Sequence, residues 1–371
     1  MIFLMMVEAF YQQQKTKQQS PWSDMMFNLN SGHVLMWALR GVEFIVYGYI
    51  LTYYSLELLP EMPYWLLFII AFICWDFGHY CFHYMHHKFK WLWMIHVVHH
   101  EGTEFNLSLG LRNSWLSPLT SMPFFFFLAI IGVPLEIFIL VGSIHYGVQF
   151  YNHIGVVKQS GFLEHIMVTP SAHKVHHGIQ DLYKDTNFGS VLNIWDRIFG
   201  TFQREQLDIP VQLGVIEPLG TENIFWANII PIAERFGIKI KVPNYGLKRA
   251  SDRQIVINGL LIFGVFLQYL IIEHDSNLLL KGLIFAIGFT GTIGLGFITE
   301  GHVWGYRLNL ICSSLLIGTY FYSIGNSISS LELNLVLVLV SNLTLLYFSP
   351  IQQDIKAMPF TTDATNLKLV E

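Results

Sequence analysis

The chain has 371 residues, of which 53% are hydrophobic, 15% aromatic and only 13% charged. Soluble domains usually carry about 25% charged residues, so this composition is typical of a membrane protein and argues against a soluble one. The formal net charge of −5 is mild and no basic stripe alternates with aromatic residues, which argues against a nucleic-acid partner.

About eight apolar stretches approach the ~20 residues that an α-helix needs to cross a bilayer. They lie near 34–56, 63–85, 116–132, 134–152, 254–272, 278–298, 307–325 and 332–349. Only Gly132–Pro134 separates the third stretch from the fourth, so these two should form a tight hairpin. The sequence therefore predicts an all-α fold, a polytopic bundle of membrane helices.

The basic residues predict which side of this bundle is cytoplasmic. The connections after the first, fifth and seventh stretches contain no Lys or Arg, whereas the opposite side carries Lys15, Lys17, Lys88, Lys90, Arg112 and the polar segment 153–253. By the positive-inside rule that opposite side is cytoplasmic. We expect an integral membrane protein, in the endoplasmic reticulum of a eukaryote or the inner membrane of a bacterium.

The same features divide the chain into five segments. Residues 1–33 form an N-terminal segment, 34–205 a catalytic membrane domain and 206–253 a linker. Residues 254–349 should form accessory transmembrane helices, and 350–371 a cytoplasmic tail.

Three histidine-rich motifs lie on the predicted cytoplasmic side. They are HYCFHYMHH at 79–87, HVVHH at 96–100 and HKVHH at 173–177. Positions three and four apart share a helix face, so the three rings of each HxxHH motif should reach one target. In the first motif, His79, His83 and His87 follow one another at intervals of four and could converge on the same point.

So many clustered imidazoles predict metal ions, because imidazole suits Zn, Cu, Fe and Ni. One tetrahedral ion takes four ligands, and the motifs offer more than twice that number, which favours two ions. No HExxH motif is present, so zinc-dependent hydrolysis is disfavoured. Neutral ligands leave positive charge on the metals that an oxygen-derived anion can balance, which favours oxygen chemistry.

Two long segments carry a family resemblance. Residues 75–114, WDFGHYCFHYMHHKFKWLWMIHVVHHEGTEFNLSLGLRNS, and residues 149–202, beginning QFYNHIGVV, resemble the fatty acid hydroxylase and sterol desaturase superfamily of membrane di-iron enzymes. Within it, EFNLSLGLRNS, the Gln149 and His153 pair and the additional C-terminal helices are similar to the alkylglycerol monooxygenase branch.

The resemblance implies a set of metal ligands and neighbouring polar residues. The ligands would be His83, His87, His96, His99, His100, His153, His173, His176 and His177. Glu104, Asn106, Arg112, Asp185 and Asn187 match polar positions beside them that could orient ligands or hold a proton path. His79 stands where relatives tend to carry an aromatic residue, and the pattern leaves open whether His79 and His86 join the ligands.

The resemblance also implies an activity. Two Fe ions would reduce O2 as co-substrate and hydroxylate a lipid C–H bond. If that bond lies next to the ether oxygen of an alkylglycerol, the hydroxylation would lead to cleavage of the ether. Tetrahydrobiopterin, or a protein donor of the cytochrome b5 or ferredoxin type, would supply electrons. The expected partners are thus a lipid substrate, the membrane and an electron donor.

Two alternatives remain open. The same di-iron scaffold could serve a sterol or fatty-acyl desaturase or hydroxylase, because these reactions share the hydrogen abstraction. A non-enzyme, a metal- or haem-binding membrane protein, is disfavoured because the histidines lie at helix ends and in polar loops. Transport would need ionisable groups at mid-membrane, where only Arg40 and Glu43, spaced as an ion pair, occur.

Overall fold

The computed structural model describes residues 1–17, 20–59, 61–242, 250–272 and 278–324. Within these ranges the chain is helical and forms no strand, with two isolated bridges, Met167 with Leu192 and Gly178 with Leu213. The predicted all-α fold class is confirmed. The eighth predicted stretch, 332–349, and the tail 350–371 lie outside the described residues.

Three helices precede the histidine motifs. They are α1 (Ile2–Thr16), α2 (Trp22–Ser31) and α3 (His33–Tyr54). In α3 the expected ion pair between Arg40 and Glu43 forms, one turn apart on the same face. Such a pair lets two charged side chains neutralise each other inside an apolar helix.

The first two histidine motifs lie on α4 (Tyr64–Lys88) and α5 (Lys90–His100). Only Phe89 separates the helices, and its extended backbone (φ −105°, ψ 118°) reverses the chain so that α5 packs back against α4. The turn brings the C-terminal histidines of α4 close to those of α5. Histidines on either side of the turn at Phe89 therefore face one another.

The third predicted stretch is broken. It consists of α6 (Ser117–Ser121), the 3₁₀ turn η2 (Met122–Phe124) and α7 (Phe126–Ile131). Pro123 has no N–H for helix hydrogen bonding, which accounts for the interruption. Gly132, with φ +98°, ends α7, and Pro134 precedes α8 (Leu135–Asn152), so the expected tight turn lies at 132–134.

The third histidine motif lies on a short helix in the polar segment. After the 3₁₀ turns η1 (Leu107–Leu111) and η3 (Gly161–His165) come α9 (Pro170–His176), α10 (Ile194–Ile198) and α11 (Ile224–Arg235). The Thr169 hydroxyl caps α9 by accepting a hydrogen bond from the Ala172 N–H at 3.4 Å, and Pro170 takes the first helical position.

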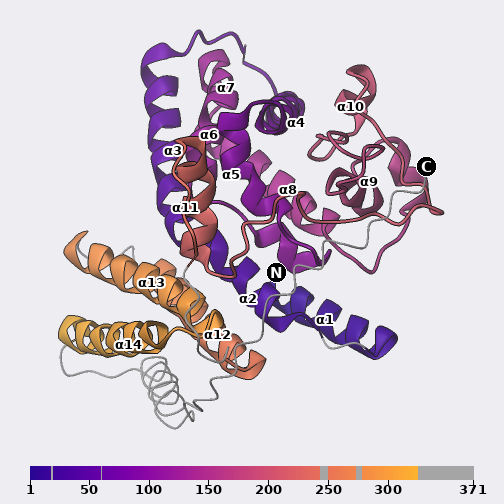
Figure 1. The fold of residues 1–371 in the computed structure, drawn as a ribbon. Helices are drawn as coiled ribbons and strands as arrows, with labels where there is room; N and C mark the ends of the chain where they lie inside the picture. The colour runs from indigo at the N-terminus through magenta and orange to yellow at the C-terminus, as the bar shows by residue number, and fades with distance from the viewer. Residues whose placement is uncertain (18–19, 60, 243–249, 273–277, 325–371) are drawn as a thin grey trace.

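The C-terminal helices form a layer of their own, at the lower left of Figure 1. They are α12 (Asp252–Ile272), α13 (Leu278–Thr299) and α14 (Val303–Ile324), and α13 packs along α14. A core of buried residues from α1, α2, η1, α12 and α13 joins this layer to the rest of the chain. Through this core, α1 and α2 connect the C-terminal layer to η1.

Two described helices, α4 and α13, are long and apolar enough to cross a membrane, judged by length and composition. A second core packs α4 against α3, α7 and α8 around Trp75, Phe125 and Val141. Close packing explains Gly78 on α4, because a Cβ there would lie 2.7 Å from the Phe124 carbonyl oxygen. The membrane helices expected at other positions, and the cytoplasmic side, stay predictions.

Candidate metal centre

The structure brings all nine histidines of the expected ligand set together in two neighbouring groups. The five-histidine group contains His83, His87, His96, His100 and His176. The four-histidine group contains His99, His153, His173 and His177. Within each group the ligand atoms lie within 4.8 Å of one another, and the side chains are buried, His87 only in part.

Each HxxHH motif divides between the two groups. On α5, His96 and His100 point to the five-histidine group and His99 to the other. On α9 the assignment is reversed, because His173 and His177 share the four-histidine group and His176 joins the first. The expectation of one target per motif is therefore wrong: positions i+3 and i+4 differ by about 100° around a helix, enough to aim at two centres.

The nitrogens of the five-histidine group are closely spaced. Nε2 of His83 lies 3.1 Å from Nε2 of His96, which lies 3.2 Å from Nε2 of His100. Nε2 of His100 is also 3.1 Å from Nε2 of both His87 and His176. Helices α4, α5 and α9 thus each supply histidine ring nitrogens to the five-histidine group.

The four-histidine group repeats this spacing with a ligand from the end of α8. Nε2 of His153 lies 3.3 Å from Nε2 of His99 and 2.9 Å from Nε2 of His173, and His173 lies 3.3 Å from His177. The two groups are adjacent, since the rings of His100 and His177 stack with centroids 4.5 Å apart.

These distances fit bound metal ions. A metal–imidazole bond of about 2.1 Å places neighbouring ligand nitrogens about 3.0 Å apart at right angles and about 3.4 Å apart in a tetrahedron. The observed Nε2 separations, from 2.9 to 3.3 Å, fall near this range. The residues therefore suit one cation in each group.

Backbone carbonyls fix which ring nitrogen faces each centre. A carbonyl oxygen only accepts, so a ring nitrogen bonded to one must carry the proton. Nδ1 donates to such an oxygen in His83 (Phe188, 3.0 Å), His99 (Arg112, 2.8 Å), His153 (Gln149, 2.8 Å) and His176 (Thr186, 2.7 Å). Nε2 of each of these rings then carries the lone pair that a metal needs.

Burial keeps the rings neutral as well. It lowers the pKa of His99 to about 4. The pKa values of His96, His100, His153, His173, His176 and His177 are also lowered well below the usual value, first by burial and then by neighbouring imidazoles. Neutral imidazole is the form that binds metals, so the site is prepared for ligation at neutral pH.

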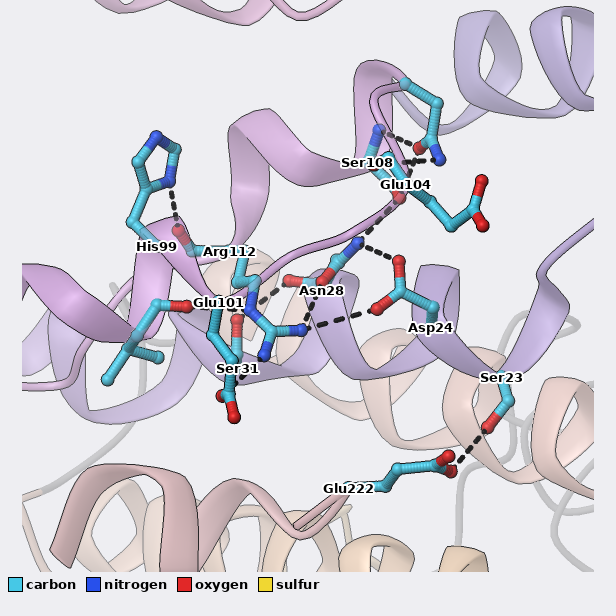
Figure 2. A network of polar contacts seen from close by, with 12 residues as sticks. Ser23, Asp24, Asn28, Ser31, His99, Glu101, Glu104, Ser108, Arg112 and Glu222 are labelled. Atoms are coloured by element: carbon cyan, nitrogen blue, oxygen red, sulfur yellow. Dashed lines mark hydrogen bonds and ion pairs between the residues drawn. The ribbon is translucent and has the colours of Figure 1, made fainter. Parts of the chain in front are cut away.

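Arg112 connects the centre to the N-terminal helices, as Figure 2 shows. Its guanidinium donates to the Val98 carbonyl (2.7 Å), to Glu101 (3.0 Å) and to Asp24 (3.3 Å). Burial raises the pKa of both carboxyls, and the charge of Arg112 opposes that rise. Since the Arg112 carbonyl also orients His99, this buried arginine links α2, α5 and the four-histidine group.

The other polar residues expected beside the ligands have different surroundings. Asp185 accepts from Nδ1 of His87 at 3.3 Å and pairs with Lys88 at 2.9 Å. Asn106 caps η1 through the Ser108 N–H, and Asn187 donates to the Ala172 and Gln203 carbonyls. Among the five, Asp185 is the one whose side chain contacts a ligand ring.

Glu104 is exposed, and Figure 2 shows its carboxylate extending away from the His99 ring. Only its backbone carbonyl enters the polar network, accepting from Asn106 Nδ2 at 3.5 Å. A catalytic role for Glu104, Asn106 or Asn187 therefore stays a prediction without a contact to the ligand rings.

His79 and His86 belong to neither group. Both ring nitrogens of His86 are occupied, by the Phe82 carbonyl (2.8 Å) and the Thr120 hydroxyl (3.0 Å). His79 is buried between Trp75 and Phe82, beside the His83 ring at 5.5 Å between centroids. These positions suit packing next to the centre.

Sequence reasoning gave no role to three acidic residues that support the centre. Asp76 accepts from the Val191 N–H, and Asp196 from the N–H groups of Phe188 and Gly189. Glu8 accepts from Leu107 N–H (2.7 Å) and Gly155 N–H (2.6 Å), which tethers α1 beside His153. The signal available in the sequence was a carboxylate inside an apolar run, which must find a partner when buried.

Comparison with known proteins agrees with this geometry. The fatty acid hydroxylase family model matches residues 68–201. The chain is 38% identical over 182 residues to an alkylglycerol monooxygenase of Homo sapiens, covering 49% of this chain and 40% of that protein. The corresponding protein of Xenopus tropicalis is 36% identical over 52% of this chain and 42% of its own length.

An ornithine lipid hydroxylase of Rhizobium tropici is 26% identical over 170 residues, covering 44% of this chain and 50% of that protein. No solved structure matches the chain. The chain spans about two fifths of the length of the alkylglycerol monooxygenases it matches. Residues 68–201, which the fatty acid hydroxylase family model matches, contain all nine histidines of the two groups.

Proposed function

We propose that this protein is a membrane-bound, O2-dependent lipid monooxygenase that holds two iron ions. The observation that carries the proposal is the convergence of nine buried Nε2 atoms, at metal-ligand spacing, inside a fatty acid hydroxylase domain. The five-histidine group would hold one ion and the four-histidine group the other. When bound, the irons would supply the reduction of O2 and the insertion of one oxygen atom into a C–H bond.

The protein's own residues prepare this chemistry. Carbonyls from four separate segments hold the rings in the ligating tautomer, so little reorganisation is needed when metal binds. Asp185 places a negative charge beside Nδ1 of His87, which makes Nε2 of that ring a stronger electron-pair donor to a bound metal. Burial excludes bulk water from the rings and limits side reactions.

An alkylglycerol is the substrate we favour, because the matched relatives of Homo sapiens and Xenopus tropicalis are alkylglycerol monooxygenases. One oxygen atom of O2 would enter the C–H bond next to the ether oxygen, and two electrons and two protons would reduce the other to water. The hemiacetal so formed collapses to a fatty aldehyde and a glycerol alcohol. Tetrahydrobiopterin, or a cytochrome b5 or ferredoxin type of protein, would supply the electrons at the cytoplasmic face.

Hydroxylation of a different membrane lipid is the second candidate. The similarity to an ornithine lipid hydroxylase favours it, since that relative's name describes hydroxylation without ether cleavage. Purified protein given an alkylglycerol, O2 and a reductant should release fatty aldehyde. Formation of a stable hydroxylated lipid, with no aldehyde, would favour the second candidate instead.

Metal analysis tests the centre itself. We expect about two irons per chain in the purified protein. His176→Ala should remove iron from the five-histidine group and His99→Ala from the other, each lowering the iron content and abolishing turnover. His165→Ala is the matched control for iron content, because His165 is exposed and belongs to neither group. A single zinc per chain, or a haem absorption band, would overturn the proposal.

A further inference from the structure

Two short turns outside the metal centre, η3 and α10, are linked to each other. Asn193 next to α10 donates from Nδ2 to the Glu164 carbonyl (2.8 Å) of η3 and to the Met167 carbonyl (3.0 Å). The bridge between Met167 and Leu192 adds a further link. η3 and α10 are therefore held together although they lie some thirty residues apart in the sequence.

Of these two turns, α10 packs against α4, well inside the helix that is long and apolar enough to span a membrane. The rings of Phe77 and Trp195 are 4.8 Å apart between centroids, and those of Tyr80 and Phe199 are 5.3 Å apart. Phe77 precedes Lys88, the end of α4, by eleven residues, which at 1.5 Å per residue is about 16 Å. The contact thus lies at a depth where α4 would be surrounded by lipid.

The loop that leads into α10 has backbone N–H groups that are satisfied from within the protein. Asp76 of α4 accepts from the Val191 N–H (2.9 Å) and from the Trp195 indole (2.9 Å). Asp196 accepts from the N–H groups of Phe188 (2.7 Å) and Gly189 (2.8 Å). Non-helical backbone is tolerated at membrane depth only when its polar groups find partners in the protein, and these carboxylates supply them.

The outward side of the turns is apolar. Phe162 is 72% exposed, Ile198 61% and Phe199 54%. Together with Leu163, Ile166 and Ile194 they form what we call the insertion surface. Single exposed apolar residues are common on proteins, but a contiguous group on two linked turns indicates a binding surface.

Basic residues stand beside the insertion surface. Arg197 is exposed, and its guanidinium lies 4.0 Å above the Phe202 ring and donates to Asn193 at 3.1 Å. Lys158 and Arg204 are exposed nearby along the chain. An apolar face next to exposed cations matches the boundary between acyl chains and anionic phosphates of a lipid leaflet.

We propose that residues 161–166 and 194–199 insert into the leaflet around the C-terminal half of α4, as a non-spanning membrane anchor. The inference rests on the proposed function in placing α4 in a membrane. The anchor is rigidly tied to the metal centre, because Phe188, held by Asp196, orients His83 through its carbonyl oxygen at 3.0 Å. The centre is thereby fixed at the membrane surface, where a lipid can reach it without leaving the bilayer.

Depth-dependent fluorescence quenching tests this. Phe162→Cys and Ile198→Cys, each in a Cys74→Ala, Cys81→Ala, Cys312→Ala background, are labelled with an environment-sensitive fluorophore and reconstituted into vesicles of phosphatidylcholine and phosphatidylglycerol. Ile69→Cys on the exposed side of α4 is the control for the spanning helix, and Lys184→Cys, exposed near the end of α4, is the control for water.

We expect nitroxide-labelled lipids to quench labels at 162, 198 and 69 at least twofold, with iodide quenching only the label at 184. Iodide quenching at 162 and 198, with lipid quenching retained at 69, would overturn the anchor and leave the membrane placement of α4 intact. Protection of 162 and 198 from both quenchers would show that protein covers the surface, which also overturns the anchor. Loss of lipid quenching at 69 as well would refute the membrane placement, and the anchor with it.

Discussion

Asp185→Asn isolates the contribution of one charge behind one ligand. Asp185 accepts from Nδ1 of His87 at 3.3 Å, and this hydrogen bond, with the Lys88 ion pair, holds the pKa of Asp185 well below its usual range. Asn keeps an oxygen at the same place and removes the charge. Asp185 has φ +58°, a left-handed conformation that Asn tolerates better than most residues, so the backbone should stay in place.

The expected loss of iron affinity follows from the general effect of removing a residue that hydrogen-bonds to a metal ligand. Removing such a partner typically weakens metal affinity about 10–100-fold, or about 1.4–2.7 kcal/mol. The exposed ion pair with Lys88 contributes little to this figure, because such pairs are worth about 0–1 kcal/mol. The effect should be confined to the five-histidine group, so one of two irons should be lost first.

The assay is the iron content of the protein after dialysis against increasing concentrations of a chelator. Asp185→Asn should lose its first iron at a chelator concentration about 10–100-fold lower than wild type. Lys88→Gln, which removes only the ion pair, and Asp181→Asn, which removes a charge from an exposed position on the same turn, should both resemble wild type. Equal iron loss in Lys88→Gln, or unchanged retention in Asp185→Asn, would refute the reasoning.

Three further outcomes are expected. Gly110→Ala should selectively weaken the four-histidine group in the chelator assay, because its Cβ would lie 2.9 Å from Nδ1 of His153. Arg112→Met should lower the free energy of unfolding by about 3 kcal/mol in chemical denaturation, since it leaves the largely buried Glu101 and the partly buried Asp24 uncompensated. Arg112→Lys should lose less. The free energy of unfolding of the metal-free protein, and with it the melting temperature, should fall as the pH falls from about 6.5 toward 4. Each ring that stays neutral only in the folded state, such as His99, should contribute a loss of about 1.4 kcal/mol per pH unit. A pH-independent melting temperature over this range would contradict the last expectation.

The sign of that pH effect follows from linkage. Burial lowers the pKa of His99 to about 4, whereas an unfolded histidine titrates near 6.5. Between these values the unfolded chain binds more protons than the folded chain, so acid favours unfolding. Above the pKa of an unfolded histidine the ring is neutral in both states, so this loss of stability is absent.

Sequence spacing predicted which histidines share a helix face because helix geometry is local. His83 and His87, or His96 and His100, share a face whatever the rest of the chain does. Spacing could not show that His99 turns to a second centre, since that depends on how α5 packs against α8 and α9. His153 stands alone in the sequence and was indicated only by the resemblance.

Helix positions were predicted where composition alone decides them, and less well where backbone chemistry intervenes. The stretch 63–85 corresponds to α4 (Tyr64–Lys88) and 278–298 to α13 (Leu278–Thr299). The stretch 116–132 breaks at Pro123, which an apolar count does not register. Asn106 and Asn187 occupied polar positions of the family pattern, but their contacts with backbone groups could be seen only in three dimensions.

Hydrogen bonds between the rings cannot account for every close contact in the centre. In His99, His153 and His176 the single proton of the neutral ring is committed to a backbone carbonyl through Nδ1. The Nε2 atoms of His99 and His153 therefore present lone pairs to each other at 3.3 Å, an arrangement that is repulsive unless a cation lies between them. Protonation would relieve it, but burial opposes charge on these rings. A bound metal removes the conflict, so metal binding should contribute directly to the stability of the folded state by joining α5, which carries His99, to the end of α8, which carries His153.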